Sequence, residues 1–310
     1  MKVSQFLRLY EQGQRDFSNL NLANADLSGV MLICVKLVGV NLTGANLSRA
    51  FLTKSDLSGA KLNLANLSFA KMSDCKLVET DLTKANLQET FMVNSTLPRA
   101  RLNGANLTNS NLKGANFWGA NLSGANLDRT NLLSANLSGV RLNFSSLREA
   151  NLSGVRFYGA SFQEADLSYS CVKDVDLSGM DLGGINFTGA RLKGANFEGT
   201  NFEGANFENA HLKEVNFRGA DLSNANFDQA VMEKVDLSGA IIDNSNFRNT
   251  NLYQTCLNSV DIKRAQTNDQ TKLPVNPIYN LPENDNFFYF EKPIIDWDNS
   301  NPQLFLNYIN

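Results

Sequence analysis

Few side chains of the 310-residue sequence have the type and spacing that catalysis or metal binding requires. His211 is the single histidine, and the cysteines stand far apart, at positions 34, 75, 171 and 256. Cysteines this scattered fit neither a disulfide framework nor a CxxC metal site. The glycines form neither a phosphate-binding loop nor a dinucleotide fingerprint. We therefore expect no catalytic residue, no metal ligand and no cofactor.

The composition narrows the class of protein further. Hydrophobic residues make up 43% of the chain, which is enough to bury a core and is not typical of a disordered protein. A net charge of −3 argues against a strongly basic nucleic-acid-binding protein. The N-terminus lacks the apolar run of a signal peptide, and the longest apolar stretch, residues 30–35, is far too short to span a membrane. These features predict a soluble protein of a reducing compartment, the cytoplasm.

A five-residue period organises most of the chain. From Phe17 to Ile262 every fifth residue is apolar, over fifty consecutive positions. Two residues before each of these, 46 of the fifty are Ala, Ser, Thr, Val or Cys, and the residue between is most often Asn or Asp. A period of five fits neither a strand nor an α-helix. It predicts a coil with five-residue sides, each with a small inward residue at its first position and a large one at its third.

The charges indicate how many sides make one coil. Residues one coil apart would lie about 4.8 Å from each other, and like charges at that distance are destabilising. At a separation of 20 we count fifteen opposite-sign pairs against three like-sign pairs; at 15 the count is nine against nine. The charges therefore predict twenty residues, and four sides, per coil. The same spacing predicts an internal ladder of rings from Phe187, Phe207, Phe227 and Phe247.

The tandem A(N/D)LXX pattern resembles that of pentapeptide-repeat proteins. It is clearest in residues 45–50 and in GANFEGTNFEGANFENA, residues 194–210, and the resemblance covers roughly residues 15–264. Residues 7–17 are similar to the lead-in of bacterial, especially cyanobacterial, members. The resemblance implies an all-β fold, a right-handed quadrilateral β-helix with four pentapeptides per 20-residue coil. Fifty units correspond to about twelve coils.

Both ends of such a stack need cover, because an open coil end is an unpaired edge. In residues 1–14, Val3, Phe6, Leu7 and Tyr10 fall on one face of a short helix, which either covers the first coil or binds a partner. Residues 265–310 contain five of the six prolines and many aromatic residues. We expect this tail to pack on the last coil; a homodimer contact through the C-terminal end and a docking arm are the alternatives.

With twenty residues per coil, only charges twenty positions apart converge. Glu208 and Asp228 meet in this way, with Arg248 next in line, which suggests either a weak cation site or, as we expect, a solvated ion-pair ladder. His211 and Cys171 are two coils apart, about 10 Å by strand spacing. That distance is too long for a nucleophile and its base.

One side has an unusual surface. Its fifth position is glycine in nine of thirteen coils, which predicts a strip of low relief. Trp and Tyr in such settings are typical of interface hot spots. Two plainer explanations stay open: glycine serves a positive φ, and scattered exposed apolar residues are common. The predicted partner-binding strip consists of apolar residues at the fourth position of this side, Val38, Val78, Pro98, Trp118 and Tyr158.

These observations favour a non-enzymatic protein–protein interaction or regulatory scaffold over an enzyme. Its partner would be another protein, with no direct binding to nucleic acid or membranes. Charge is polarised along the repeats, with a net charge of +6 in residues 15–160 and −6 in residues 161–264, which either orients a partner or reflects drift along the array. The alternative implied by the resemblance is a DNA-mimicking topoisomerase (gyrase) protection protein. The 24 acids and 24 bases of the repeats limit such mimicry to the C-terminal half.

Overall fold

Most five-residue units fold into the same β-turn. In residues 41–45, the Ala45 N–H donates to the Leu42 carbonyl at 3.0 Å, and Gly44 has a φ of 65°. A positive φ at the third turn residue is the requirement of a type II turn. The Asn41 side chain accepts from the Thr43 N–H at 3.1 Å, which satisfies the N–H that the turn leaves unpaired. Asn and Asp recur at the second position because their side chains form this local hydrogen bond.

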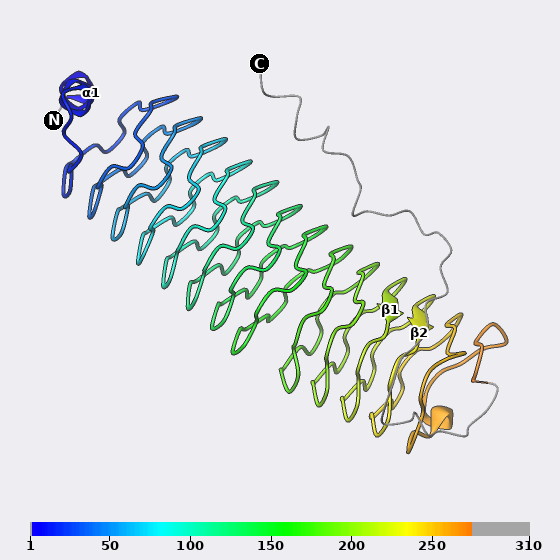
Figure 1. The fold of residues 1–310 in the computed structure, drawn as a ribbon. Helices are drawn as coiled ribbons and strands as arrows, with labels where there is room; N and C mark the ends of the chain where they lie inside the picture. Colours follow the sequence, from blue (N-terminus) through cyan, green and yellow to red (C-terminus); the bar gives the residue numbers. More distant parts are fainter. Residues whose placement is uncertain (1, 275–310) are drawn as a thin grey trace, which may run out of the picture. The chain divides into compact units, whose positions relative to one another are not determined.

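The units stack through a backbone ladder with a twenty-residue register. The computed structural model describes residues 2–274. Parallel bridges join nearly every second position to the residue twenty positions on, from Asp16–Lys36 to Asn246–Gln266. At most steps the N–H groups of positions three and five donate to the next coil, as Leu42 does to the Lys61 carbonyl at 2.7 Å. The next coil donates back to position one. The predicted twenty residues per coil is confirmed (Figure 1).

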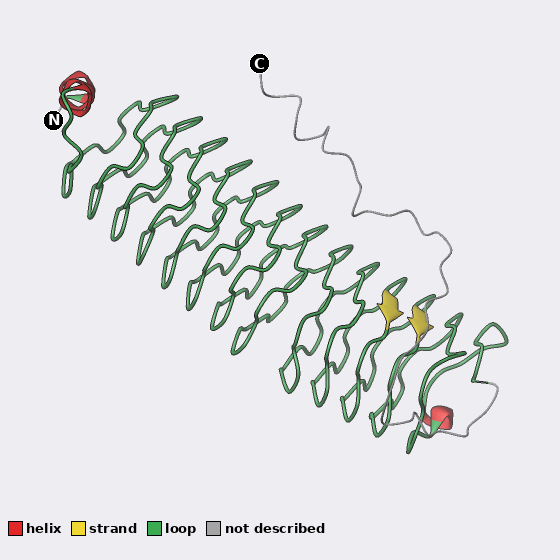
Figure 2. Ribbon diagram, in the orientation of Figure 1, coloured by secondary structure: helices red, strands yellow, loops and turns green. Residues whose placement is uncertain are grey.

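Most of these pairings are single bridges separated by turns, so few residues form extended strands (Figure 2). The strands are β1 (His211–Lys213) and β2 (Val231–Glu233), which pair in parallel. The short contacts follow from the five-residue sides, because each side turns a corner before a longer strand can form. A β-helix with sides this short therefore contains few residues in extended strands.

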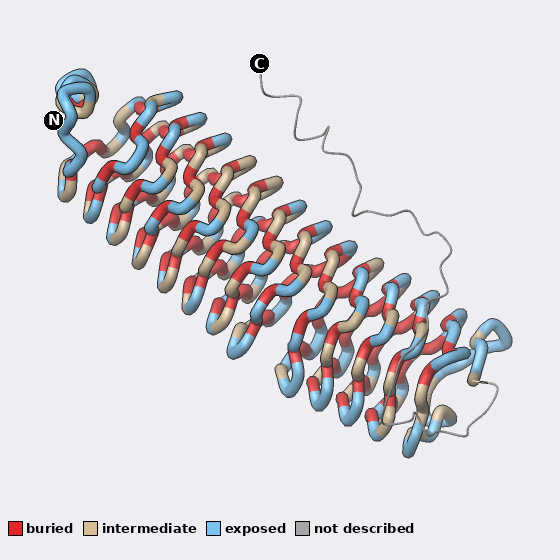
Figure 3. The backbone as a smooth tube through the Cα atoms, in the orientation of Figure 1, coloured by how far each residue is buried: buried red, intermediate tan, exposed pale blue. Residues whose placement is uncertain are grey.

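The core lies inside the coils (Figure 3). We label the four sides by their first large residue: side A begins with Phe17, side B with Leu22, side C with Leu27 and side D with Leu32. Large residues at position three and small residues at position one are almost all buried, and positions two, four and five face outward. Burial of each large side chain contributes roughly 1.5–3 kcal/mol.

The aromatic ladder on side C is confirmed. Phe187, Phe207, Phe227 and Phe247 stack with successive centroid distances of 5.4, 4.8 and 4.8 Å and interplanar angles of 18°, 0° and 3°. Rings twenty residues apart can stack only if the coils repeat in strict register. The ladder therefore reports the same geometry as the backbone bridges.

Outside, position two forms polar columns. On side C the Asn66 amide donates to the Asn46 carbonyl oxygen at 3.3 Å, and Asn86 repeats this contact on Asn66. Predicted charge pairs also form, with Arg101 3.0 Å from Asp81 and a similar pair elsewhere in the stack between Arg129 and Glu149. Exposed pairs of this kind contribute little individually.

The N-terminal end is covered by α1 (Val3–Glu11), where a short helix was predicted. Its Phe6 is fully buried and packs edge-on against Phe17, with ring centroids 4.6 Å apart. The Tyr10 hydroxyl accepts from the Ile33 N–H at 3.2 Å. These contacts support the capping role of the helix over its alternative as a partner-binding element.

At the other end the register changes. After the 3₁₀ helix Ile262–Arg264, Gln266 still pairs with Asn246, but Lys272 pairs with Asn251, twenty-one residues away. The ladder thus continues to Lys272, eight residues past the predicted repeat region, and the first residues of the tail pack on the last coil. Residues 275–310 lie outside the described part of the chain, so the plug, dimer contact and docking arm stay predictions for them. Within residues 2–274 no helix is long and apolar enough to cross a bilayer.

We expect Phe6→Ala to destabilise the first coil by about 3–5 kcal/mol, because it removes a fully buried ring and uncovers Phe17. Amide hydrogen exchange measured by mass spectrometry should accelerate in residues 16–40 and stay unchanged near residues 200–240. Leu64→Ala, which truncates an exposed side chain, is the matched control. Uniform acceleration along the whole stack would contradict the capping role.

Candidate functional site

The predicted strip runs along side A, at position four of successive coils. Trp118 is 48% exposed and Tyr158 89% exposed, Val38 is also exposed, and Val78 and Pro98 are half-buried. The five side chains are aligned but not continuous, because serines occupy coils between them. The geometry thus provides two strong aromatic anchors rather than one apolar patch.

A charged pair lies beside the first of these anchors. The Arg99 guanidinium forms an ion pair with Glu79 at 2.6 Å and lies 5.8 Å from the centre of the Trp118 ring. Sequence reasoning did not include Arg99 or Glu79 in the strip. Both occupy position five, one and two coils before Gly119, where side A otherwise favours glycine.

Positive φ does not by itself account for the glycines of side A. Position five has a positive φ on the other sides as well, in residues as bulky as Phe144 and Tyr169. On side A, Gly139 stacks directly over Gly119, and a Cβ on Gly139 would lie 3.7 Å from the Gly119 Cα. The glycines therefore produce low relief on this side beyond what the backbone requires.

The remaining sequence candidates do not converge on a catalytic site. Glu208 accepts a hydrogen bond from the Asn209 amide, and Asp228 accepts one from Asn249. His211 is exposed at the start of β1, and Cys171 contacts Ser153 at 3.3 Å. Across residues 2–274, no group of three His, Cys, Asp or Glu side chains is placed to hold a metal ion.

The structure contains a feature that sequence reasoning missed, an opening between two coils. On sides A and B the ladder is interrupted between residues 155–164 and residues 176–183. One coil earlier Leu137 donates to the Arg156 carbonyl at 2.8 Å, and one coil later Leu177 donates to Asn196 at 2.9 Å. The equivalent N–H of Phe157 has no backbone partner within the described residues. Six ladder hydrogen bonds, three on each side, are missing in this way.

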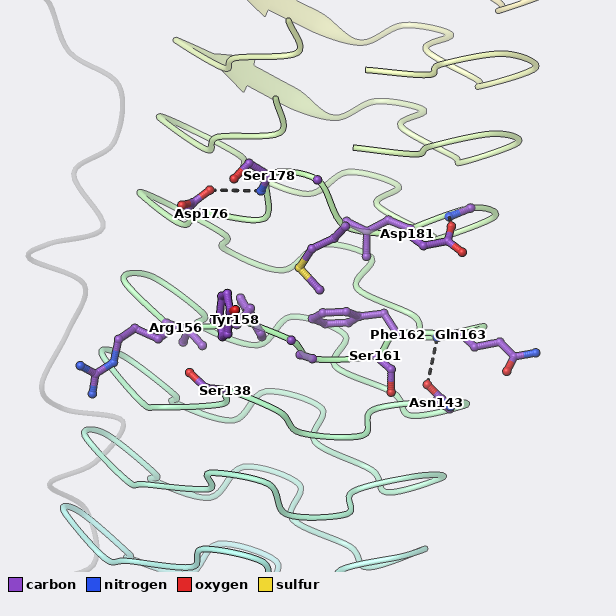
Figure 4. Close-up of a pocket in the computed structure, with 18 of the residues that line it drawn as sticks. Ser138, Asn143, Arg156, Tyr158, Ser161, Phe162, Gln163, Asp176, Ser178 and Asp181 are labelled. Atoms are coloured by element: carbon purple, nitrogen blue, oxygen red, sulfur yellow. Dashed lines mark hydrogen bonds between the residues drawn. The ribbon is translucent and has the colours of Figure 1, made fainter. Parts of the chain in front are cut away.

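The opening is wedge-shaped, because the two coils are separated on two sides and stay hydrogen-bonded on the other two. On side C Leu167 still donates to the Asn186 carbonyl at 2.9 Å, and on side D Val172 donates to Arg191 at 2.8 Å. Sides A and B are therefore open while C and D stay paired, so the wedge is widest at the corner between A and B. Its volume is about 1100 Å³. Figure 4 shows its wall residues, and the wider step is visible between green coils in Figure 1.

The wall of this opening, which we call the cleft, is both apolar and acidic. Phe157 and Phe162 pack edge to face, with centroids 5.1 Å apart, and Tyr158, at its lip, belongs also to the strip. Arg156 and Asp176 are twenty residues apart and opposite in charge, yet form no ion pair because their coils are separated.

Carboxylates outnumber cations in the wall. The lining residues include three carboxylates, Asp174, Asp176 and Asp181, and one guanidinium, that of Arg156. Hydrogen bonds from the hydroxyl and N–H of Ser178 lower the pKa of Asp176 below its usual value, so this carboxylate stays charged at neutral pH. The cleft therefore attracts cationic rather than anionic groups.

A departure from the repeat pattern coincides with the opening. The four exceptions to the small residue at position one are Arg15, Leu20, Met180 and Ile185. Arg15 and Leu20 lie in the first coil. Met180 and Ile185 lie in the later of the two coils that border the cleft. Met180 and Ala160, which face each other across the opening, are only half-buried, whereas Val140 and Thr200 at the same position in the adjoining coils are fully buried. Overpacking of a core shifts the backbone, so we expect the large residue at position 180 to favour the open step.

The coils and their backbone ladder define a β-helical solenoid. The family is established by sequence: the chain belongs to the pentapeptide-repeat proteins. The family model for pentapeptide repeats matches residues 16–49, 41–77, 75–114, 170–209, 201–239, 210–249 and 230–265. A second model, described as a pentapeptide repeat region, matches residues 110–187. No curated protein sequence gives a significant match.

Solved structures of the same family resemble the chain. HetL, a pentapeptide repeat protein involved in heterocyst differentiation regulation from the cyanobacterium Nostoc, is 29% identical, covers 84% of this chain and 99% of its own, and has a TM-score of 0.33. QnrB1, a plasmid-mediated fluoroquinolone resistance protein, is 21% identical over 66% of this chain and 92% of its own, with a TM-score of 0.32. These TM-scores are low, so the assignment rests on the family models.

We expect the N–H groups of Phe157, Gly159 and Phe162 to exchange faster than their ladder-paired equivalents one coil earlier. Met180→Ala should slow this exchange, because a small residue at position one lets the coils close. Val140→Ala truncates the same position in a closed step and serves as the control. Site-resolved amide exchange measures both effects, and equal protection of cleft and control amides in the unaltered protein would disprove the opening.

Proposed function

We propose that the protein is a non-enzymatic interaction scaffold, with a regulatory role, that binds another protein along side A. The observation that carries the proposal is the pair of exposed aromatic anchors, Trp118 and Tyr158, on a hydrogen-bonded surface that ends at the cleft. Exposed Trp and Tyr supply large contact areas at low entropic cost. From Val38 to Trp118 this surface is held by an unbroken ladder, so that part of it is already ordered before the partner arrives.

The charge distribution supports an oriented partner. Residues 15–160 carry a net charge of +6 and residues 161–264 one of −6, so the sign changes at the cleft. A partner of opposite polarity would be steered into one orientation along the coils. No direct contact with nucleic acid or membranes is part of this proposal.

The proposal includes a cytoplasmic location. Support comes from the cysteines, all four of which are free thiols, including the exposed Cys34. Free thiols are typical of reducing compartments. The proposed scaffold is a right-handed β-helix, as expected from the family, with about twelve coils, as expected from the fifty units.

The proposal is tested by recovery of partners from an extract of the native cells. The double variant Trp118→Ala/Tyr158→Ala should lose most of the recovered partner, because it removes both anchors without touching the core. Phe144→Ala/Tyr253→Ala removes two exposed aromatic residues on sides B and D and should recover the partner normally. Unchanged recovery with the first variant would reject side A as the binding surface.

We expect no protection of gyrase, the alternative implied by family membership. DNA mimicry needs an acidic surface free of cations, but several acids of the C-terminal half are paired, as in Lys213–Glu233 at 3.0 Å and Arg218–Asp236 at 3.6 Å. A supercoiling assay with and without a fluoroquinolone measures the effect. Restored supercoiling at stoichiometric protein would overturn this expectation and favour the alternative.

A further inference from the structure

We propose that the cleft is a peptide-binding site that takes an extended, basic segment of a partner protein as an additional strand between two coils. The segment would run parallel to both coils and complete the ladder that sides A and B interrupt. This inference deepens the proposed function and rests on it, because it names the chemistry of the partner. Strand addition to an open edge is a common mode of peptide recognition.

The earlier coil offers a complete parallel edge. On side A the N–H groups of Phe157 and Gly159 and the carbonyl of Val155 have no ladder partner among the described residues. On side B the same holds for the N–H groups of Phe162 and Glu164 and for the carbonyl of Ala160. Backbone polar groups require hydrogen-bonding partners. An added strand would supply them in the pattern of every other coil.

The later coil offers the complementary edge. The groups without ladder partners there are the N–H groups of Asp176 and Asp181 and the carbonyls of Asp176, Ser178, Asp181 and Gly183. A strand between the two coils could therefore bond in both directions, as an inner coil of the stack does. The two edges belong to one chain and keep a common register through the intact sides C and D.

The shape of the wedge suits a backbone that turns the corner. One inserted strand needs the coil spacing to double, from about 4.8 to about 9.6 Å, and the wedge is widest where sides A and B meet. That corner is lined by Gly159 and Gly179, and a Cβ built on either would meet no atom within 4 Å. The absence of side chains there lets another backbone approach closely.

Side-chain chemistry selects the occupant. Ala160 and Met180 occupy position one of side B, which points into the core in other coils. Here both residues are partly open to the cleft and offer contact to an apolar side chain at the corner. The three aspartates favour a basic segment. Residues 275–310 of this chain carry five acids and one base, so their charge has the same sign as the cleft. Charge complementarity therefore favours a segment of a different protein.

A suitable probe exists within the repeat itself. Residues 135–144, ANLSGVRLNF, form sides A and B of a normal coil and contain one arginine. This peptide, labelled with fluorescein, should bind the full chain saturably in fluorescence anisotropy. N-methylation at the residues equivalent to Leu137 and Leu142 removes two ladder donors and should weaken binding about tenfold or more. N-methylation at the Ser138 and Asn143 equivalents, which donate nothing to the ladder, should have a smaller effect.

The protein variants test the cleft itself. Met180→Ala should abolish peptide binding while the amide exchange of the cleft slows, which shows that the coils have closed rather than unfolded. Val140→Ala should bind the peptide like the unaltered chain. Replacing the peptide arginine by glutamate should weaken binding, because of the aspartates in the wall.

Three outcomes would overturn the inference. The first is equal peptide binding by Met180→Ala and the unaltered chain, and the second is equal binding of the two N-methylated peptides. The third is a chain that never binds the peptide but self-associates, with the self-association lost in Met180→Ala. The peptide assay uses no native partner. Its failure is therefore distinguishable from failure of the scaffold proposal, which the Trp118→Ala/Tyr158→Ala recovery decides.

Discussion

The backbone ladder between coils is the constraint on which the rest of the structure depends. Outside the cleft a typical side donates two N–H groups to the next coil and accepts one in return, and this pattern requires twenty residues per coil. A single inserted residue would turn a large side chain out of the core and shift every following pair. The unbroken five-residue period over fifty units is the trace of this requirement in the sequence.

The same constraint shapes the surface. Side chains on one side line up in columns, so amides bond to amides, as Asn66 does to Asn46, and opposite charges meet, as Arg101 and Asp81 do. Neighbouring sides diverge, so functional groups seldom converge from different directions as they do in an enzyme cleft. A protein built this way is suited to presenting an ordered surface, and the positions proposed here as functional are those where a column or the ladder departs from the pattern.

Two departures coincide in one part of the chain. The aromatic strip on side A ends at Tyr158, and the ladder opens between this coil and the next. The net charge also changes sign there. Unpaired backbone edges are normally avoided or covered, because they invite strand pairing. Retaining two facing edges within a closed solenoid is consistent with a site for which pairing is the function.

By itself, the sequence determined the repeat, the coil length, the buried positions, the Phe187–Phe247 ladder and the helix carrying Phe6, because each depends on a local pattern or a fixed separation of residues. It also contained Met180 and Ile185, two large residues in small-residue positions, but a period count treats these as tolerated exceptions. Only the tertiary structure decided their effect: whether neighbouring coils absorb the extra volume or separate depends on packing across the step. The separation left Arg156 and Asp176 unpaired, although the twenty-residue rule places them together, since hydrogen bonds on the two closed sides hold the coils in register while the other two sides open.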